Sequence, residues 1–338
     1  MTTVVAATLL LAVVAYAVFG GADFGAGFWD LVAGGDKRGE RPREVIERAI
    51  GPVWESNHVW LIFIFVVLWT GFSEAYASIW LTLFVPLTIA ALGIVLRGSG
   101  FAFRKAVTRL RYRRIFGGAF AIPSLIVPFC MGTVVGAVAS GRVPAGGVAG
   151  DPVESWLNPT SILGGVLAVT VAAYMASVYL VVDAARIDDD DMVAYFRRRA
   201  IGAAVVAGMV AAGGIFILKS DARYLYDGLI SRAWPFVILS ALFGISSLVL
   251  LVRSKHTHGT RVIAALAVTM IIISWGVAQW DYILPESLTL AQASAPSGTL
   301  GALIVAVVMA VLIVGPGFFW LYRLDQQGML PEEGVERA

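Results

Sequence analysis

The chain has 338 residues, of which 59% are hydrophobic and only 14% are charged. Soluble domains carry about 25% charged residues, so this composition excludes a soluble protein and indicates one that crosses a membrane several times. The net charge of +2 gives no sign of a nucleic-acid partner. The single cysteine, Cys130, excludes both a disulfide framework and a cysteine-based metal site within one chain.

Nine segments meet the length of about 20 predominantly apolar residues that a membrane-spanning helix needs. Each must be helical, because lipid cannot satisfy the polar groups of an open backbone. We therefore expect an all-α polytopic membrane protein in which residues 1–338 form a single membrane domain. The nine expected spans are residues 4–30, 53–72, 76–96, 116–139, 160–183, 199–219, 233–252, 262–281 and 299–322.

The distribution of lysine and arginine predicts the orientation of these spans. Of the 25 basic residues, 21 lie in the loops after the first, third, fifth and seventh spans or in the C-terminal tail. Basic residues favour the cytoplasmic side of a membrane. We therefore expect the N-terminus outside and the C-terminus in the cytoplasm, so that the first span ends, and the second begins, at the cytoplasmic face.

Four loops carry further signals. The loop 97–115 is the most basic, which predicts a cytoplasmic anchor, with a contact to anionic lipid as the alternative. The acidic run 188–191 is expected to form a solvated turn, with a cation site as the alternative. The outer loops 140–157 and 282–298 are too short for a folded external domain.

The stretch 51–62, GPVWESNHVWLI, is the most informative part of the chain. The apolar run that follows, 59–72, is too short to span a bilayer alone, so the helix must begin earlier and carry Glu55, Asn57 and His58 into the membrane. An acid inside a membrane helix marks a functional site by default. The alternative is that Glu55 lies at the interface and caps the helix N-terminus, where the helix dipole favours a carboxylate.

A second acid lies near the end of the first span, within the glycine-rich stretch 20–30. Gly21 and Gly25 form a GxxxG step, which lets a neighbouring helix approach closely. Asp23 lies between them, so we expect a paired or proton-exchanging carboxylate rather than a solvated one. Because the first two spans are antiparallel, Asp23 and Glu55 are expected to face each other near the cytoplasmic side.

The sequence lacks the motifs of a catalytic cofactor protein. It has no CxxCH motif, phosphate-binding loop or HExxH motif. A haem ligand at membrane depth would have to be His58, which can share a helix face with Trp54 and Glu55. We expect His58 to be a hydrogen-bonding partner of a carboxylate instead. The chain is thus predicted to bind no metal or cofactor and to run no redox reaction alone.

Several elements, taken in order, resemble subunit II of cytochrome bd-type quinol oxidases. Residues 20–28, GGADFGAGF, resemble the family element DGFDxGVG, and residues 51–62 resemble xPxWDGNQVWLI. Residues 96–104, LRGSGFAFR, resemble RGxxFEFR. The tripeptide 157–159 and the outer loop 285–297 also match.

This resemblance implies two four-helix bundles plus one additional helix in a bacterial cytoplasmic membrane. It implies a heterodimer with subunit I, which carries haem b, haem d and the quinol site, and which oxidises quinol while dioxygen is reduced to water. Asp23 and Glu55 would lie on a proton route from the cytoplasm, supported by Trp54, Asn57 and His58. A structural quinone, small accessory subunits and the identity of the quinol are left open.

Three positions depart from the family pattern. Glu55 replaces an aspartate, His58 replaces a glutamine and Ala102 replaces an acid. The alternative function is a proton-coupled transporter or channel. Such proteins favour helices broken at the membrane midplane and repeated halves, and the prolines of this chain do not form such a pair.

Overall fold

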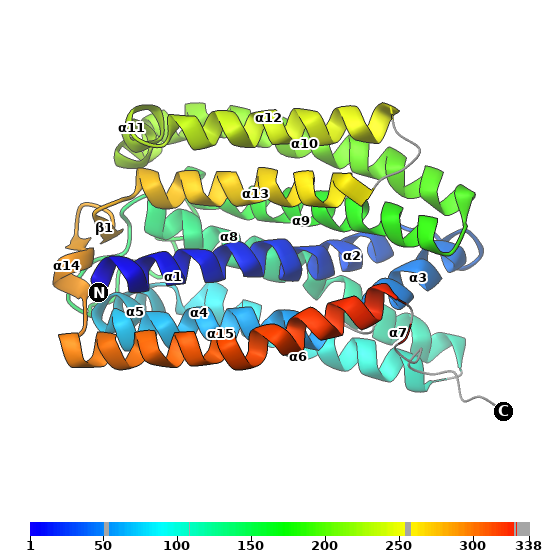
Figure 1. Cartoon of the computed structure of the whole chain (residues 1–338), viewed down its shortest axis with the longest axis horizontal. Coiled ribbons are helices and arrows are strands. Elements are labelled where there is room, and N and C mark those ends of the chain that lie inside the picture. The colour runs from blue at the N-terminus through cyan, green and yellow to red at the C-terminus, as the bar shows by residue number, and fades with distance from the viewer. Residues whose placement is uncertain (51–53, 108, 254–257, 328, 330–338) are drawn as a thin grey trace.

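The computed structural model describes residues 1–50, 54–107, 109–253, 258–327 and 329. Long helices run side by side along one axis, with the N-terminus at one end of the bundle (Figure 1). Within these residues, eight helical segments are long and apolar enough to cross a membrane. The number rises to nine if the bent pair Asn57–Gly71 and Ser73–Thr82 forms one span. The all-α expectation is confirmed, apart from one two-stranded hairpin.

The first half of the chain contains α1 (Thr2–Ala15), the π-helix η1 (Tyr16–Gly20), α2 (Gly21–Leu31), α3 (Asp36–Ile50), α4 (Trp54–Gly71), α5 (Ser73–Thr82), α6 (Phe84–Ala106), α7 (Leu110–Ala121) and α8 (Pro123–Ala139). The second half contains α9 (Pro159–Arg186), α10 (Asp190–Asp221), α11 (Arg223–Ser231), α12 (Trp234–Arg253), α13 (His258–Ala278), β1 (Tyr282–Leu284), β2 (Leu288–Thr289), α14 (Leu290–Ala293) and α15 (Ser297–Gln326). The strands β1 and β2 pair antiparallel in the connection before α15.

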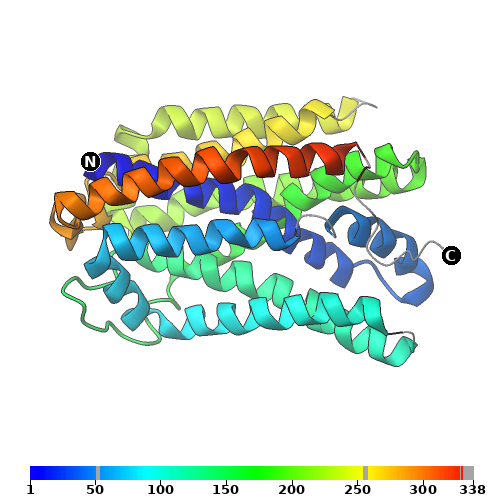
Figure 2. The same cartoon turned by 60° about the horizontal axis from the view of Figure 1, so that its bottom comes forward.

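Helix α9 lies at the centre of the packing and contacts α2, α8, α10 and α13. On one side α1 packs on α4, and α8 packs on α2 and α6. On the other side α10, α12 and α13 pack with α9. Helix α15 lies against α1 and α4 and crosses the front of the bundle in Figure 2. The first span, formed by α1, η1 and α2, therefore lies between the two groups of helices.

The expected third span, residues 76–96, has the wrong boundaries. The chain bends by 119° between α4 and α5, and α6 begins only at Phe84. Phe72 and Leu83, which stand between these helices, have non-helical backbone angles and fully buried side chains. Helix α6 then continues to Ala106, so that the first part of the predicted basic loop is helical.

Residues 36–50 are charged and form the helix α3, which packs near the C-terminal ends of α2 and α9. Its apolar face buries Val45, Ile46 and Ile50 in the core. Burial of these side chains explains why a short polar helix is stable here, because helices of this length depend on tertiary packing.

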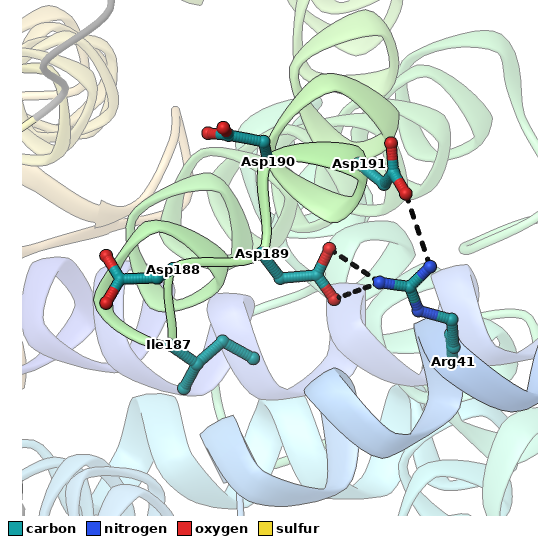
Figure 3. Close-up of a pocket in the computed structure, with 6 residues that line it drawn as sticks. All are labelled: Arg41, Ile187, Asp188, Asp189, Asp190 and Asp191. Carbon is teal, nitrogen blue, oxygen red and sulfur yellow. Dashed lines mark hydrogen bonds and ion pairs between the residues drawn. The ribbon is translucent and has the colours of Figure 1, made fainter.

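The acidic run 188–191 is only partly the solvated turn that we expected. The Asp189 carboxylate caps α10 by accepting from the Met192 backbone N–H at 3.1 Å. Arg41 of α3 donates to Asp189 at 2.8 Å and to Asp191 at 3.3 Å, as Figure 3 shows. The two carboxylates raise the pKa of Arg41 above its ordinary value. The guanidinium of Arg41 is thus the positively charged group that pairs with the carboxylates of this turn.

The first span meets α9 through Gly25. A Cβ atom added at Gly25 would lie 1.8 Å from the backbone oxygen of Ala172, so no larger residue fits without moving the helices apart. Gly21 is different, because its nearest neighbour, the Ala172 Cα, would lie 4.0 Å from an added Cβ. The two glycines of the GxxxG step therefore do not contribute equally to the close approach.

We predict that Gly25→Ala destabilises the protein by about 1 to 3 kcal/mol, because overpacking forces backbone shifts. Gly21→Ala is the matched control and leaves stability unchanged or slightly higher. Thermal denaturation of the purified membrane protein in detergent measures both. Equal losses in the two variants would contradict this assignment of the contact to Gly25.

Candidate functional site

Asp23 lies on α2 inside the helix bundle and is only 3% exposed. The Nδ2 atom of Asn57 on α4 donates a hydrogen bond of 2.7 Å to its Oδ2 atom. Asn57 is also 3% exposed. A carboxylate that is removed from both water and lipid needs such polar partners, because burying an unpaired charge is very unfavourable.

The second charge at this site is Arg97 of α6, which is 1% exposed. Its Nη2 atom donates to the Asp23 backbone oxygen, and its Nε atom donates to Ser124 Oγ, both at 3.0 Å. The guanidinium also lies 4.9 Å from the ring centre of Phe24 and 5.0 Å from that of Phe120. Its positive charge acts on the Asp23 carboxylate and offsets the charge of a buried acid.

Arg97 and Arg104 correct our interpretation of the basic loop. The sequence predicted a surface anchor or lipid contact for residues 97–115, yet both of these arginines are buried. Sequence reasoning missed them because a hydropathy window treats an arginine as the end of a span. A usable signal was present: the resemblance of residues 96–104 to a family element that contains both arginines.

A second buried acid, Asp30, lies two helical turns after Asp23 and is also 3% exposed. Arg43 of α3 donates to its Oδ1 atom at 2.9 Å, and Arg104 of α6 donates to its Oδ2 atom. Arg104 also pairs with Glu47 of α3 at 2.8 Å. We call these four residues the Asp30 ion-pair network. It joins α3 to the C-terminal parts of α2 and α6.

The structure describes the side chains of only some of the other expected site residues. Trp54 and Glu55 belong to the first turn of α4, but their side chains lie outside the described part of the structure. Asn57 reaches Asp23, and the His58 ring lies edge-on to Phe24, with ring centres 5.7 Å apart. Ala102, which replaces a family acid, is exposed on α6.

His58 packs against an aromatic ring, which reduces the space beside its imidazole. An axial ligand needs open space for the porphyrin beside its imidazole, and the Phe24 ring occupies one side of His58. Across the residues that the structure describes, no three His, Cys, Asp or Glu side chains are grouped so that they could hold a metal ion.

A buried acid and arginine within a bundle of long apolar helices define an integral membrane protein with an internal polar site. Residues 1–325 match the family of cytochrome bd terminal oxidase subunit II, and the chain belongs to that family. This match covers both acids, both buried arginines and all of the helical bundle except the last residue of α15.

Similar proteins agree with this assignment. A putative cytochrome bd menaquinol oxidase subunit II of Bacillus subtilis is 22% identical, over 91% of both chains. Subunit 2 of cytochrome bd-I ubiquinol oxidase from Escherichia coli is also 22% identical, over 96% of this chain and 93% of that one. A chain in the structure of bd oxidase from Geobacillus thermodenitrificans is 26% identical, with a TM-score of 0.78, and the match covers 96% of this chain and 98% of that one.

We predict that Arg97→Lys destabilises the protein by about 1.5 to 3 kcal/mol, the usual value of a hydrogen bond to a charged group. Lysine keeps the charge but cannot reproduce the planar contacts with Ser124, Phe24 and Phe120. Arg111→Lys, at an exposed position, is the control and should have little effect. Thermal denaturation of both variants measures the difference. A variant Arg97→Lys as stable as this control would contradict the structural role of Arg97.

Proposed function

We propose that this chain is the non-haem subunit II of a bd-type terminal oxidase in a bacterial cytoplasmic membrane. It would form a heterodimer with subunit I, which would carry haem b, haem d and the site of quinol oxidation. Membership of the family and the names of the similar proteins support this proposal. They favour it over a proton-coupled transporter or channel. The whole chain would act as one membrane domain with its N-terminus outside.

The surface of the bundle supports a scaffolding role as the first part of this proposal. The last helix exposes many large apolar side chains, among them Val311, Leu312 and Ile313. In a membrane such a face contacts either lipid or the helices of a partner. The chain would thus support subunit I without taking part in electron transfer.

The second proposed role is transport of protons from the cytoplasm. The observation that carries it is the buried Asp23 carboxylate, which has an amide donor on one oxygen and the Arg97 charge nearby. An ionisable group inside a membrane bundle that is not locked in an ion pair can exchange protons with its neighbours. Glu55, near the start of the adjacent helix α4, would be the next acid on this route. Reduction of dioxygen to water consumes protons, so the oxidase needs such a route.

The test is quinol oxidase turnover of the assembled complex with Asp23→Asn or Glu55→Gln. Each substitution keeps the shape and hydrogen bonding of the side chain but removes its exchangeable acid proton. We expect turnover to fall by about tenfold or more, because a positioned acid or base typically contributes more than this. Haem content should remain intact.

Asp227→Asn is the control. Asp227 lies in α11 at the opposite end of the bundle, where it forms an exposed pair with Arg223. Its substitution should leave turnover unchanged. Normal turnover in Asp23→Asn, in Glu55→Gln and in the double variant would disprove the proton route. Loss of haem and of assembly would instead assign these residues a structural role.

We also predict that the chain purifies colourless when it is expressed alone and that the haem absorbance appears only when subunit I is present. The reason is that Phe24 fills space that a haem on His58 would need. Visible spectra of the isolated chain and of the complex measure this. A stoichiometric haem in the isolated chain that disappears on His58→Ala would contradict the prediction.

A further inference from the structure

The Tyr16 hydroxyl is a buried polar group that the proposed route does not yet use. It is inaccessible to solvent and has no hydrogen-bond partner among the described residues. Buried hydroxyl groups in native proteins nearly always have a partner, which is either a protein atom or an ordered water molecule. This hydroxyl therefore indicates a binding position for a small polar molecule beside the first span.

The backbone explains how Tyr16 reaches this position. Tyr16 begins the π-helix η1, which connects α1 to α2 and ends three residues before Asp23. A π-helical turn holds one extra residue, so side chains before it are rotated relative to those after it, and such turns often occur at functional sites. Tyr16 is thereby brought over Phe24, with which it makes an edge contact at 6.4 Å between ring centres.

The Tyr16 ring lies directly beside Gly20, in space that is open because glycine has no side chain. A Cβ atom added at Gly20 would lie 2.9 Å from the Cδ2 and Cε2 atoms of that ring. The ring also packs against a buried apolar cluster that includes Phe24, Val127 and Ala172. These contacts fix the ring, and hence the position of its hydroxyl.

The hydroxyl is electrostatically coupled to the charges of the site, and the Tyr16 ring packs on Phe24, the residue next to Asp23. Both the Arg97 guanidinium and the Asp23 carboxylate act electrostatically on it. Among the described residues, Asn57 makes the only side-chain hydrogen bond to the Asp23 carboxylate, on Oδ2. The Oδ1 atom can therefore accept from another donor.

We propose that the Tyr16 hydroxyl and the Asp23 carboxylate share a bound water molecule, and that Tyr16 is a positioning residue for the proton route. The water would complete the hydrogen bonding of both groups, and the hydroxyl would fix its place. The functional part of this inference rests on the proposed proton route, whereas the water-mediated link between the two side chains can be tested without it.

The experiment uses the assembled oxidase with Tyr16→Phe, which removes only the hydroxyl oxygen and its proton. Infrared difference spectra are recorded upon reduction, and the Asp23 bands are identified by their loss in Asp23→Asn. We expect the Asp23 bands to shift in Tyr16→Phe. Turnover should fall by about two- to tenfold, which corresponds to the loss of one hydrogen bond, with haem content intact.

Tyr174→Phe is the matched control. Tyr174 is also a buried tyrosine, but its hydroxyl lies 2.6 Å from Ser247 Oγ, and its substitution should leave the Asp23 bands and the turnover unchanged. If Tyr16→Phe does not assemble, Gly20→Ala displaces the ring without removing the hydroxyl and should shift the same bands. Unshifted Asp23 bands in the variant that assembles would overturn the proposal.

The two hypotheses fail in different ways. Normal turnover in Asp23→Asn, in Glu55→Gln and in the double variant would disprove the proton route, while the infrared bands would still decide whether Tyr16 and Asp23 share a water. Slow turnover in Asp23→Asn with normal turnover and unshifted bands in Tyr16→Phe would leave the route intact and remove Tyr16 from it.

Discussion

The structure depends on burying the guanidinium of Arg97 inside the helix bundle. Its positive charge there is balanced by nearby polar groups and by the Asp23 carboxylate. Its contacts come from α2 and from the α7–α8 region, so three helical segments must approach within hydrogen-bonding distance. Glycines make this approach feasible. A Cβ atom at Gly27 would lie 2.1 Å from Ser124 Oγ, and one at Gly100 would lie 2.7 Å from the Phe120 backbone nitrogen. Small residues at these positions are therefore a requirement of the buried charge.

The two buried acids of α2 have similar exposure but different surroundings. Asp30 pairs with two arginines, one on each carboxylate oxygen, and connects three helices. Asp23 receives a neutral amide and faces an arginine that bonds to its backbone rather than to its carboxylate. Breaking a buried ion pair is strongly destabilising, so the contacts of Asp30 hold α2, α3 and α6 together. The Asp23 carboxylate has no direct ion pair among the described residues, as the proposed proton route requires.

The helical architecture and the proximity of α2 to α4 could be predicted from the sequence, because apolar length and the distribution of basic residues reflect the bilayer directly. The contact of Asp23 with Asn57 follows from that antiparallel arrangement. Arg97 and Arg104 could not be placed from hydropathy, since their burial depends on partners 74 residues away. The bend after α4 was missed for a similar reason: Phe72 and Leu83 are apolar, and only their tertiary packing distinguishes them from residues of a continuous helix.

The two acids of α2 are separated in sequence from their arginines on α6 by the same number of residues, and this separation affects the order in which the contacts form during synthesis. Asp23 and Arg97 are 74 residues apart, and so are Asp30 and Arg104. A ribosome adds about 5 to 20 residues per second, so each acid is synthesised about 4 to 15 seconds before its arginine. During that interval the two acids can meet Arg43 and Asn57 but not yet the arginines of α6. Both contacts form when α6 packs beside α2. Insertion of the third span therefore completes the polar contacts of the two buried acids in the first span.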